Sequence, residues 1–299
     1  MRESLDTLIN QTIALEYTLP NEPTETPKIT VSTASDECYK ILTQDFDLAK
    51  IIYNGIVDYS FEESAIDLTR LDVLQARALK SKLKFDADAN IDQQLNYGLY
   101  GEVLLHLMLQ KFHNTGTMIS RGHFYNLLNS SETTGYDTYQ MRLMPDGNIE
   151  LWFGEVKFHK DFRTGITQIL DKIGTSLSDD YFGDNIIAME DYETFVSTDV
   201  DISPMLDAFR EDPEVNLAQI ADAQGLSFIY PMLVIFNDEE KAYDEIIKNV
   251  VNYTNRKYPS LNLNFSLECK LFFMFLPVKL AKDIKELVRS WIMSKEPLI

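Results

Sequence analysis

Apolar residues recur along the chain at two spacings, and the changes between them predict alternating helices and strands. A repeat of three to four residues is typical of a helix with one buried face, whereas a short apolar run is typical of a strand. Helical spacing covers residues 36–53, 68–83, 91–112, 162–177, 239–256 and 280–293. Strand-like runs cover residues 139–144, 149–158, 228–236 and 271–278, and residues 117–125 fit a short strand. This order predicts an α/β fold with a mixed sheet flanked by helices.

The clearest local pattern is a β-hairpin in the middle of the chain. Residues 139–144 and 149–158 are rich in β-forming side chains. Between them, the segment Pro145-Asp146-Gly147-Asn148 consists of turn-forming residues. We therefore expect two antiparallel strands joined by a tight turn, followed by the helix over 162–177.

Two segments stand apart from the main pattern. Residues 1–88 combine helical spacing with a proline-containing linker at 20–27, which predicts an N-terminal helical region that could dock a partner. Residues 89–299 would form the main domain, interrupted at 179–225 by an acidic insertion of loops and short helices. Whether residues 1–88 form a separate domain stays open at this level.

Charge is distributed unevenly along the sequence. The net charge is −20, yet residues 179–225 hold 13 acidic residues and 1 basic residue, whereas residues 101–178 hold 8 and 7. Because salt screens exposed charges beyond about 10 Å, the nearly neutral middle can still meet a polyanion. We interpret the acidic segment as a solvated surface, with a docking or DNA-mimicking face as the alternative.

Composition and missing motifs disfavour several classes of protein. No apolar run approaches the roughly 18 residues of a membrane-spanning helix, no signal peptide is visible, and two distant cysteines favour a reducing cytoplasm. The sequence also lacks the P-loop, GxGxxG, HExxH and GxSxG motifs, and its four histidines have no zinc-like spacing. These absences argue against a nucleotide-driven motor, a Rossmann dehydrogenase, a zinc protease and a serine hydrolase.

The remaining candidate chemistry lies in the hairpin. Asp137 stands at the entry of its first strand, and Glu155 and Lys157 lie two apart in the second, so they share a face. Two carboxylates can converge on a hard cation such as Mg²⁺ or Mn²⁺, and a neighbouring lysine can orient water or stabilise charge on a phosphate. The alternative is a cross-strand salt bridge on an exposed face. Burying such charges is costly unless they are paired or bound to metal.

A further carboxylate, Glu102, lies on the helix predicted over 91–112. It shares a stripe with apolar residues and with His106 one turn later, so it either faces a polar site or pairs with a neighbour such as His106. His106 itself fits a satisfied buried histidine better than a ligand. Gln168, on the helix after the hairpin, fits an exposed glutamine better than a substrate contact.

The order of a helix with Glu, an Asp, Glu-x-Lys in a hairpin and a second helix resembles the PD-(D/E)XK restriction-endonuclease-like core. The segments YGLYGEVLLHLML, GYD and ELWFGEVKFHKD carry this likeness. Together with IYPMLVIFND and KLFFMFLP, they resemble the nuclease subunit of the Hachiman anti-phage system, the HamA family, over roughly residues 90–299. One departure is Tyr136 in place of the proline of the motif.

The resemblance implies a cytoplasmic DNA nuclease that depends on Mg²⁺ or Mn²⁺ and works with a superfamily 2 helicase. Asp137 and Glu155 would be metal ligands, Lys157 the catalytic lysine, and Glu102 the carboxylate that completes the metal shell. Two alternatives stay open. The chain could be a catalytically silent subunit that regulates a helicase, or, more weakly supported, a DNA mimic acting through residues 179–225.

Overall fold

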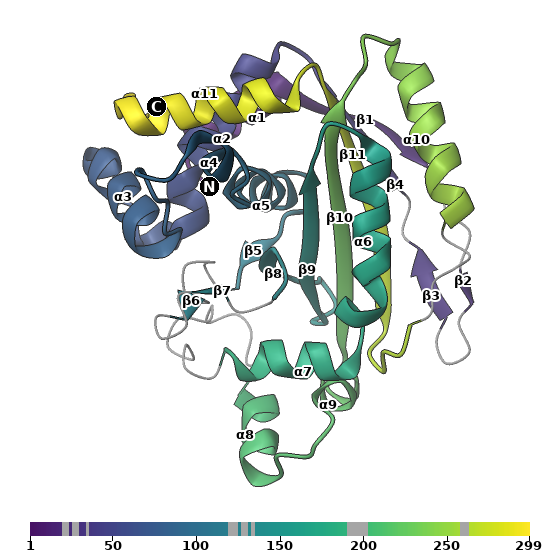
Figure 1. Ribbon diagram of the computed structural model, residues 1–299. Coiled ribbons are helices and arrows are strands. Elements are labelled where there is room, and N and C mark those ends of the chain that lie inside the picture. Colours follow the sequence, from purple (N-terminus) through teal and green to yellow (C-terminus); the bar gives the residue numbers. More distant parts are fainter. Residues whose placement is uncertain are drawn as a thin grey trace.

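The computed structural model describes residues 1–19, 24–25, 30–33, 36–118, 125–126, 131–132, 135–189, 203–257 and 263–299 (Figure 1). The strands are β1 (Ile13–Leu19), β2 (Thr24–Glu25), β3 (Thr30–Thr33), β4 (Asp36–Ile41), β5 (Gly116–Thr117), β6 (Tyr125–Asn126), β7 (Ser131–Glu132), β8 (Thr138–Leu143), β9 (Ile149–Phe158), β10 (Leu226–Asn237) and β11 (Cys269–Val278). The helices are α1 (Glu3–Thr12), α2 (Asp45–Ser60), α3 (Leu71–Arg77), α4 (Ile91–Leu95), α5 (Leu99–His113), α6 (Phe162–Ser176), α7 (Asp179–Ile187), α8 (Ser203–Glu211), α9 (Leu217–Ala223), α10 (Tyr243–Lys257) and α11 (Ala281–Ser294). Short helical turns are η1 (Glu63–Ala65), η2 (Leu68–Arg70) and η3 (Ala78–Lys82).

One mixed sheet organises the molecule, with the strand order β1-β4-β11-β10-β9-β8-β5. The central strands β4, β11, β10 and β9 run parallel, and antiparallel pairs close both sides, β1 with β4 and the hairpin β8–β9. Strands β2 and β3 join the sheet through β11, and β6 and β7 form a separate small pair. The predicted α/β class with a mixed sheet is confirmed.

Helices cover both faces of the sheet (Figure 1). On one face, apolar residues of α6, α7, α9 and α10 pack against alternate residues of β9, β10 and β11. On the other face, α1, α2, α5 and α11 pack against the remaining alternate residues of the same strands. The central strands are therefore buried on both sides, which explains why β10 and β11 read as continuous apolar runs.

The N-terminal region differs from the prediction because it contributes strands as well as helices. Residues 36–41 form β4 rather than the start of a helix, and helix α2 begins only at Asp45. Strand β4 pairs with β11, and the Asp36 carboxylate accepts a hydrogen bond of 2.8 Å from the Phe273 backbone N–H. Tertiary pairing thus overrides the helix-like spacing of this segment. The boundary at residue 88 remains a prediction.

Most later elements lie where the sequence predicts them. The hairpin turn holds Gly147 at φ +89°, α6 begins at Phe162, and the described part of the acidic segment forms short helices. The predicted helix over 91–112 is divided into α4 and α5 at Asn96-Tyr97-Gly98. The strand expected over 117–125 is represented by β5 and β6, and residues 119–124 lie outside the described residues. Among the described helices, none is long and apolar enough to cross a membrane.

Candidate active site

Strands β8 and β9 separate at Asp137, and this residue marks the point of separation. The Asp137 backbone N–H still donates to the Gly154 carbonyl at 2.8 Å. Two residues further along β9, the Val156 N–H donates to the Asp137 side-chain oxygen Oδ2, also at 2.8 Å, and not to a carbonyl of β8. The carboxylate therefore takes the place of the next ladder acceptor, and the last residues of β9 have no β8 partner.

Close packing on the other side of β9 fixes the backbone just before Glu155. A Cβ built on Gly154 would lie 2.6 Å from the Pro231 carbonyl oxygen and 2.8 Å from the Pro231 Cγ. Pro231 stands in the central strand β10, where proline is rare because it cannot donate a ladder hydrogen bond. Glycine is therefore required at position 154, because any Cβ there would overlap Pro231.

Glu155 and Lys157 point to the same face of β9, the face covered by α6, as their spacing predicts. They form an ion pair in which the Lys157 ammonium also donates to the Val156 carbonyl at 3.2 Å. Glu155 is 8% exposed, and burial raises the pKa of its carboxyl, with the negative charge of Asp137 adding to the rise. The positive charges of Lys157 and Lys172 oppose it. The structure thus brings Asp137, Glu155 and Lys157 together.

Glu102 approaches from the opposite face of β9. It lies in the first turn of α5, is 6% exposed, and accepts a hydrogen bond of 2.8 Å from the Tyr59 hydroxyl of α2. Two glycines allow this turn to pack closely. A Cβ on Gly98 would collide with the Glu102 carboxylate, and one on Gly101 would lie 2.9 Å from Val156. The suggested pairing of Glu102 with His106 does not occur.

His106 is instead held within the core. Its Nδ1 lies 2.7 Å from the Gln140 amide nitrogen, which also donates to the His106 carbonyl at 2.9 Å. The imidazole packs edge-on against the Tyr59 ring, and burial lowers its pKa to about 3. The imidazole is therefore neutral at physiological pH. His106 is buried, as predicted, but it is not fully satisfied, because its Nε2 has no hydrogen-bond partner among the described residues.

A cavity of about 210 Å³ lies where β9 loses its β8 partner. It is lined by Asn96, Tyr97, Gly98, Gly101, Glu102, Asp137, Val156, Lys157, Phe158, His159 and Lys285. Gln168 is exposed, as predicted, but its side chain bonds the His159 ring at 2.7 Å and so holds a residue of the rim. The break between α4 and α5 supplies one wall of this cavity.

The carboxylates of Asp137 and Glu155 are the groups best suited to a metal ion. Magnesium is commonly bound by one or two carboxylates together with waters and substrate phosphates. A cation here would also offset the repulsion that raises the pKa of Glu155. Within the described residues, no three Asp, Glu, His or Cys side chains gather closely enough to hold a metal, so Glu102 does not form one ligand set with the other two.

Three contributors to the site escaped the sequence analysis. Tyr59 positions Glu102 through its hydrogen bond. The second contributor is the buried Tyr230: burial raises the pKa of its hydroxyl, and the negative charges of Glu155 and Asp137 raise it further. Lys285 enters the cavity from α11. Lys285 belongs to the tripeptide Asp283-Ile284-Lys285, which has the same acidic-x-Lys pattern as Glu155-Val156-Lys157. Because this tripeptide lies in a helix, its Asp and Lys side chains do not face each other.

The fold and this geometry define an α/β protein whose mixed sheet carries two convergent carboxylates and a lysine beside an open strand edge. The family model of HamA matches residues 15–292, and the chain therefore belongs to the HamA family. Membership supports a role in anti-phage defence of the Hachiman type. No curated protein and no solved structure matches the sequence.

Proposed function

We propose that the chain is a divalent-metal-dependent DNA nuclease that hydrolyses phosphodiester bonds as the effector of an anti-phage complex with a superfamily 2 helicase. The observation that carries the proposal is the convergence of Asp137, Glu155 and Lys157 where β8 leaves β9. The family relationship supports the defence role, and the helicase partner follows from the sequence resemblance.

Each residue has a role that its surroundings favour. Asp137 and Glu155 would hold Mg²⁺ or Mn²⁺, which when bound lowers the pKa of water and neutralises phosphoryl oxygens. The Lys157 ammonium, freed from Glu155 as that carboxylate turns to a cation, would face the attacked phosphate and stabilise its charge. Glu102, held by Tyr59, would orient water at the wall of the cavity.

One observation favours a second candidate, a catalytically silent subunit that regulates its helicase. The Glu155 carboxylate is already satisfied by Lys157, and Asp137 is hydrogen-bonded to the β9 backbone. Such an arrangement can persist for structural reasons alone, because removing one partner of a buried pair leaves the other charge uncompensated.

Cleavage assays with a matched control separate the two candidates. The full chain, alone and with a candidate superfamily 2 helicase, is incubated with supercoiled and linear plasmid in Mg²⁺, Mn²⁺ or EDTA. Glu155→Gln and Lys157→Met should abolish cleavage and defence. The control changes Glu239→Gln and Lys241→Met, which remove an exposed Glu-x-Lys ion pair of 2.6 Å and should change nothing.

Two results would contradict the nuclease proposal. The first is the absence of metal-dependent cleavage in every combination of chain, helicase and DNA. The second is full defence by folded Glu155→Gln and Lys157→Met proteins. Defence that survives these changes, but is lost when the chain is deleted, identifies the silent regulatory subunit.

A further inference from the structure

Lys285 reaches the candidate cavity from a helix far along the chain. It lies on the first turns of α11, and its ammonium donates to the carbonyl of Phe158, the residue that follows Lys157 in β9, at 3.1 Å. Its nitrogen lies 4.9 Å from the centre of the Phe158 ring and 5.9 Å from that of Tyr100. The stem is thus packed against aromatic rings, while the charged end lies at the unpaired end of β9.

The charge of Lys285 is only partly compensated. An ammonium has three donors, and the Phe158 carbonyl takes one of them. Across the described ranges, no carboxylate lies within ion-pair distance of Lys285, whereas Lys157 is paired with Glu155. Burial lowers the pKa of the Lys285 ammonium to about 8, so at neutral pH it remains mostly protonated. A half-buried cation with spare donors is stabilised by an incoming anion.

Other groups around the cavity indicate where that anion would lie. Glu102 and Asp137 line the same space and would repel a phosphate unless a cation intervened. Burial lowers the pKa of His159, which keeps this neighbour mostly neutral. One turn beyond Lys285 on α11, Arg289 donates to the Gln94 side chain of α4, so both cations lie on the side of α11 that faces α4 and α5. A polyanion leaving the carboxylates therefore meets Lys285 and then Arg289 on this side of α11.

We propose that Lys285 binds a phosphodiester next to the one that is cut, on the same DNA strand. The contact would be made by the N–H donors of its ammonium that Phe158 does not use. The inference rests on the proposed nuclease function and adds to it a substrate contact supplied by α11. Lys285 would hold the strand in register over Asp137, Glu155 and Lys157, while Lys157 serves the bond that breaks. The binding partner is the phosphate backbone, so no dependence on base sequence is expected.

The test compares Lys285→Met and Lys285→Arg with Lys282→Met. Lys282 is an exposed lysine on the same helix, paired with Glu286 at 3.3 Å, and serves as the control. A fluorescent duplex oligonucleotide is titrated by anisotropy in Ca²⁺ at several NaCl concentrations, with the protein alone and with its helicase. Thermal unfolding of each variant reports whether it is folded.

Lys285→Met should weaken binding about tenfold and reduce the salt slope by about one. In cleavage assays it should raise KM with little change in kcat. Lys285→Arg should restore most of the binding, and Lys282→Met should match the unmodified protein. A purely structural Lys285 would leave the salt slope unchanged.

The outcomes distinguish this inference from the proposed function. If the chain cleaves DNA and the Lys285 variants bind with an unchanged Kd and salt slope, the Lys285 contact is wrong and the nuclease proposal stands. If binding depends on Lys285 but nothing is cleaved, the contact is supported and the nuclease proposal fails. If the unmodified protein neither binds nor cleaves DNA in either form, both are overturned.

Discussion

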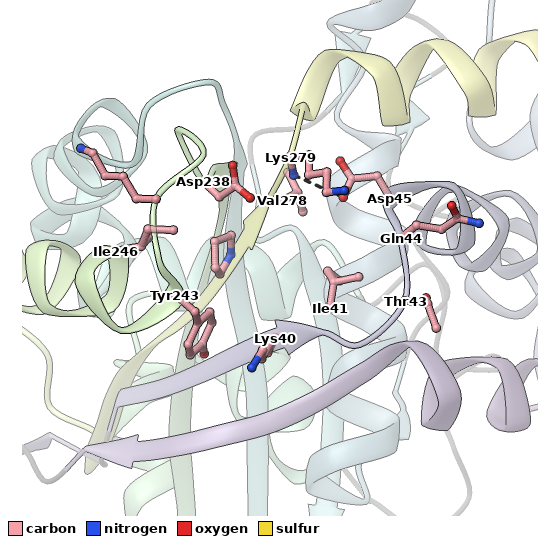
Figure 2. Close-up of a pocket in the computed structure, with 12 residues that line it drawn as sticks. Lys40, Ile41, Thr43, Gln44, Asp45, Asp238, Tyr243, Ile246, Val278 and Lys279 are labelled. Atoms are coloured by element: carbon pink, nitrogen blue, oxygen red, sulfur yellow. Dashed lines mark hydrogen bonds between the residues drawn. The ribbon is translucent and has the colours of Figure 1, made fainter.

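Two charged cavities open at the carboxyl ends of the parallel strands, and they use their charges differently. The first lies at the end of β9 and contains Asp137, Lys157 and Lys285. The second, of about 160 Å³, lies at the ends of β4, β10 and β11 (Figure 2). It is lined by Lys40, Ile41, Thr43, Gln44, Asp45, Asp238, Lys241, Tyr243, Ile246, Pro277, Val278 and Lys279. Both cavities occupy the edge at which open α/β sheets commonly bind ligands.

In the second cavity, each carboxylate satisfies nearby backbone groups. Figure 2 shows Asp45 beside Lys279, and the Asp45 carboxylate accepts hydrogen bonds from the backbone N–H groups of Lys279 (3.2 Å) and Leu280 (2.9 Å). Asp238 accepts one from the Glu240 N–H at 2.9 Å, within a turn. Lys40 lies over the Tyr243 ring, 5.2 Å from its centre. These charges stabilise a helix start, a turn and a ring contact.

The first cavity differs because the Asp137 carboxylate, which lines it, lies close to the buried carboxylate of Glu155. Asp137 raises the pKa of Glu155, which burial has already raised, and neither residue caps a helix. Perturbed titration in a cleft is a sign of function only when such a specific charge partner explains it. Position at the sheet edge therefore does not identify a site by itself. A buried carboxyl group whose pKa is raised by a neighbouring charge, as in Glu155, is the more selective criterion.

The largest expected contrast is between Asp137→Asn and Asp238→Asn. Both aspartates accept a backbone N–H at a strand end, at 2.8 Å and 2.9 Å. Asp137→Asn should reduce the rate of DNA cleavage by at least about 100-fold, because a group acting at the reacting centre is lost. Asp238→Asn should leave the rate within about twofold. Equal effects on single-turnover rates would show that the two cavities are not functionally distinct.

The second prediction concerns the backbone that supports the first cavity. Gly154→Ala should lower the free energy of unfolding by about 1–3 kcal/mol, because its Cβ would meet the Pro231 backbone. Gly183→Ala is the matched control, since the nearest side-chain atom to its Cβ is 4.0 Å away, and this helix position should gain up to about 1 kcal/mol. Urea unfolding measures both. A neutral Gly154→Ala would mean that the two strands can separate without cost.

The third prediction uses His106 in the core beneath the first cavity. Its pKa falls from 6.5 to about 3 on folding, so the unfolded state binds one more proton between these values. The free energy of unfolding should therefore decline as the pH falls from 6.5 towards 3, by up to about 1.4 kcal/mol per pH unit. His106→Gln should flatten this part of the curve. An unchanged slope would show that the imidazole is protonated in the folded protein.

The smallest effect is expected for Asp45→Ala in the second cavity. Losing two hydrogen bonds to the residues that precede α11 should cost about 1 kcal/mol of stability. Cleavage and DNA binding should stay unchanged once the variant is folded. A loss of cleavage with normal stability would assign catalytic importance to this cavity and remove the distinction drawn above.

The hairpin and its charges could be predicted because the information is local. A turn-forming segment fixes the pairing of β8 with β9, and the pairing of Thr138 with Gly154 places Asp137 next to Glu155. The two-residue period of a strand then puts Lys157 on the same face. Each step depends on residues that lie within about twenty positions of one another in the sequence.

Contacts between distant segments could not be predicted in this way. Residues 36–41 have apolar positions compatible with a helix, and only the pairing of β4 with β11 makes them a strand. Likewise, the bond from Tyr59 to Glu102 and the entry of Lys285 into the cavity depend on the packing of α2 and α11 against α5 and β9. Periodicity describes which face of an element is buried, but it does not name the element that covers it.

The pairing of β4 with β11 has a consequence for biosynthesis. Asp36 and Phe273, which join these strands, are 237 residues apart. On the ribosome, β4 emerges long before the strand that will receive it, and β10 emerges with one edge still open. The sheet can therefore close only after β11 has been made, and until then the nascent chain carries unpaired strand edges that chaperones would need to shield.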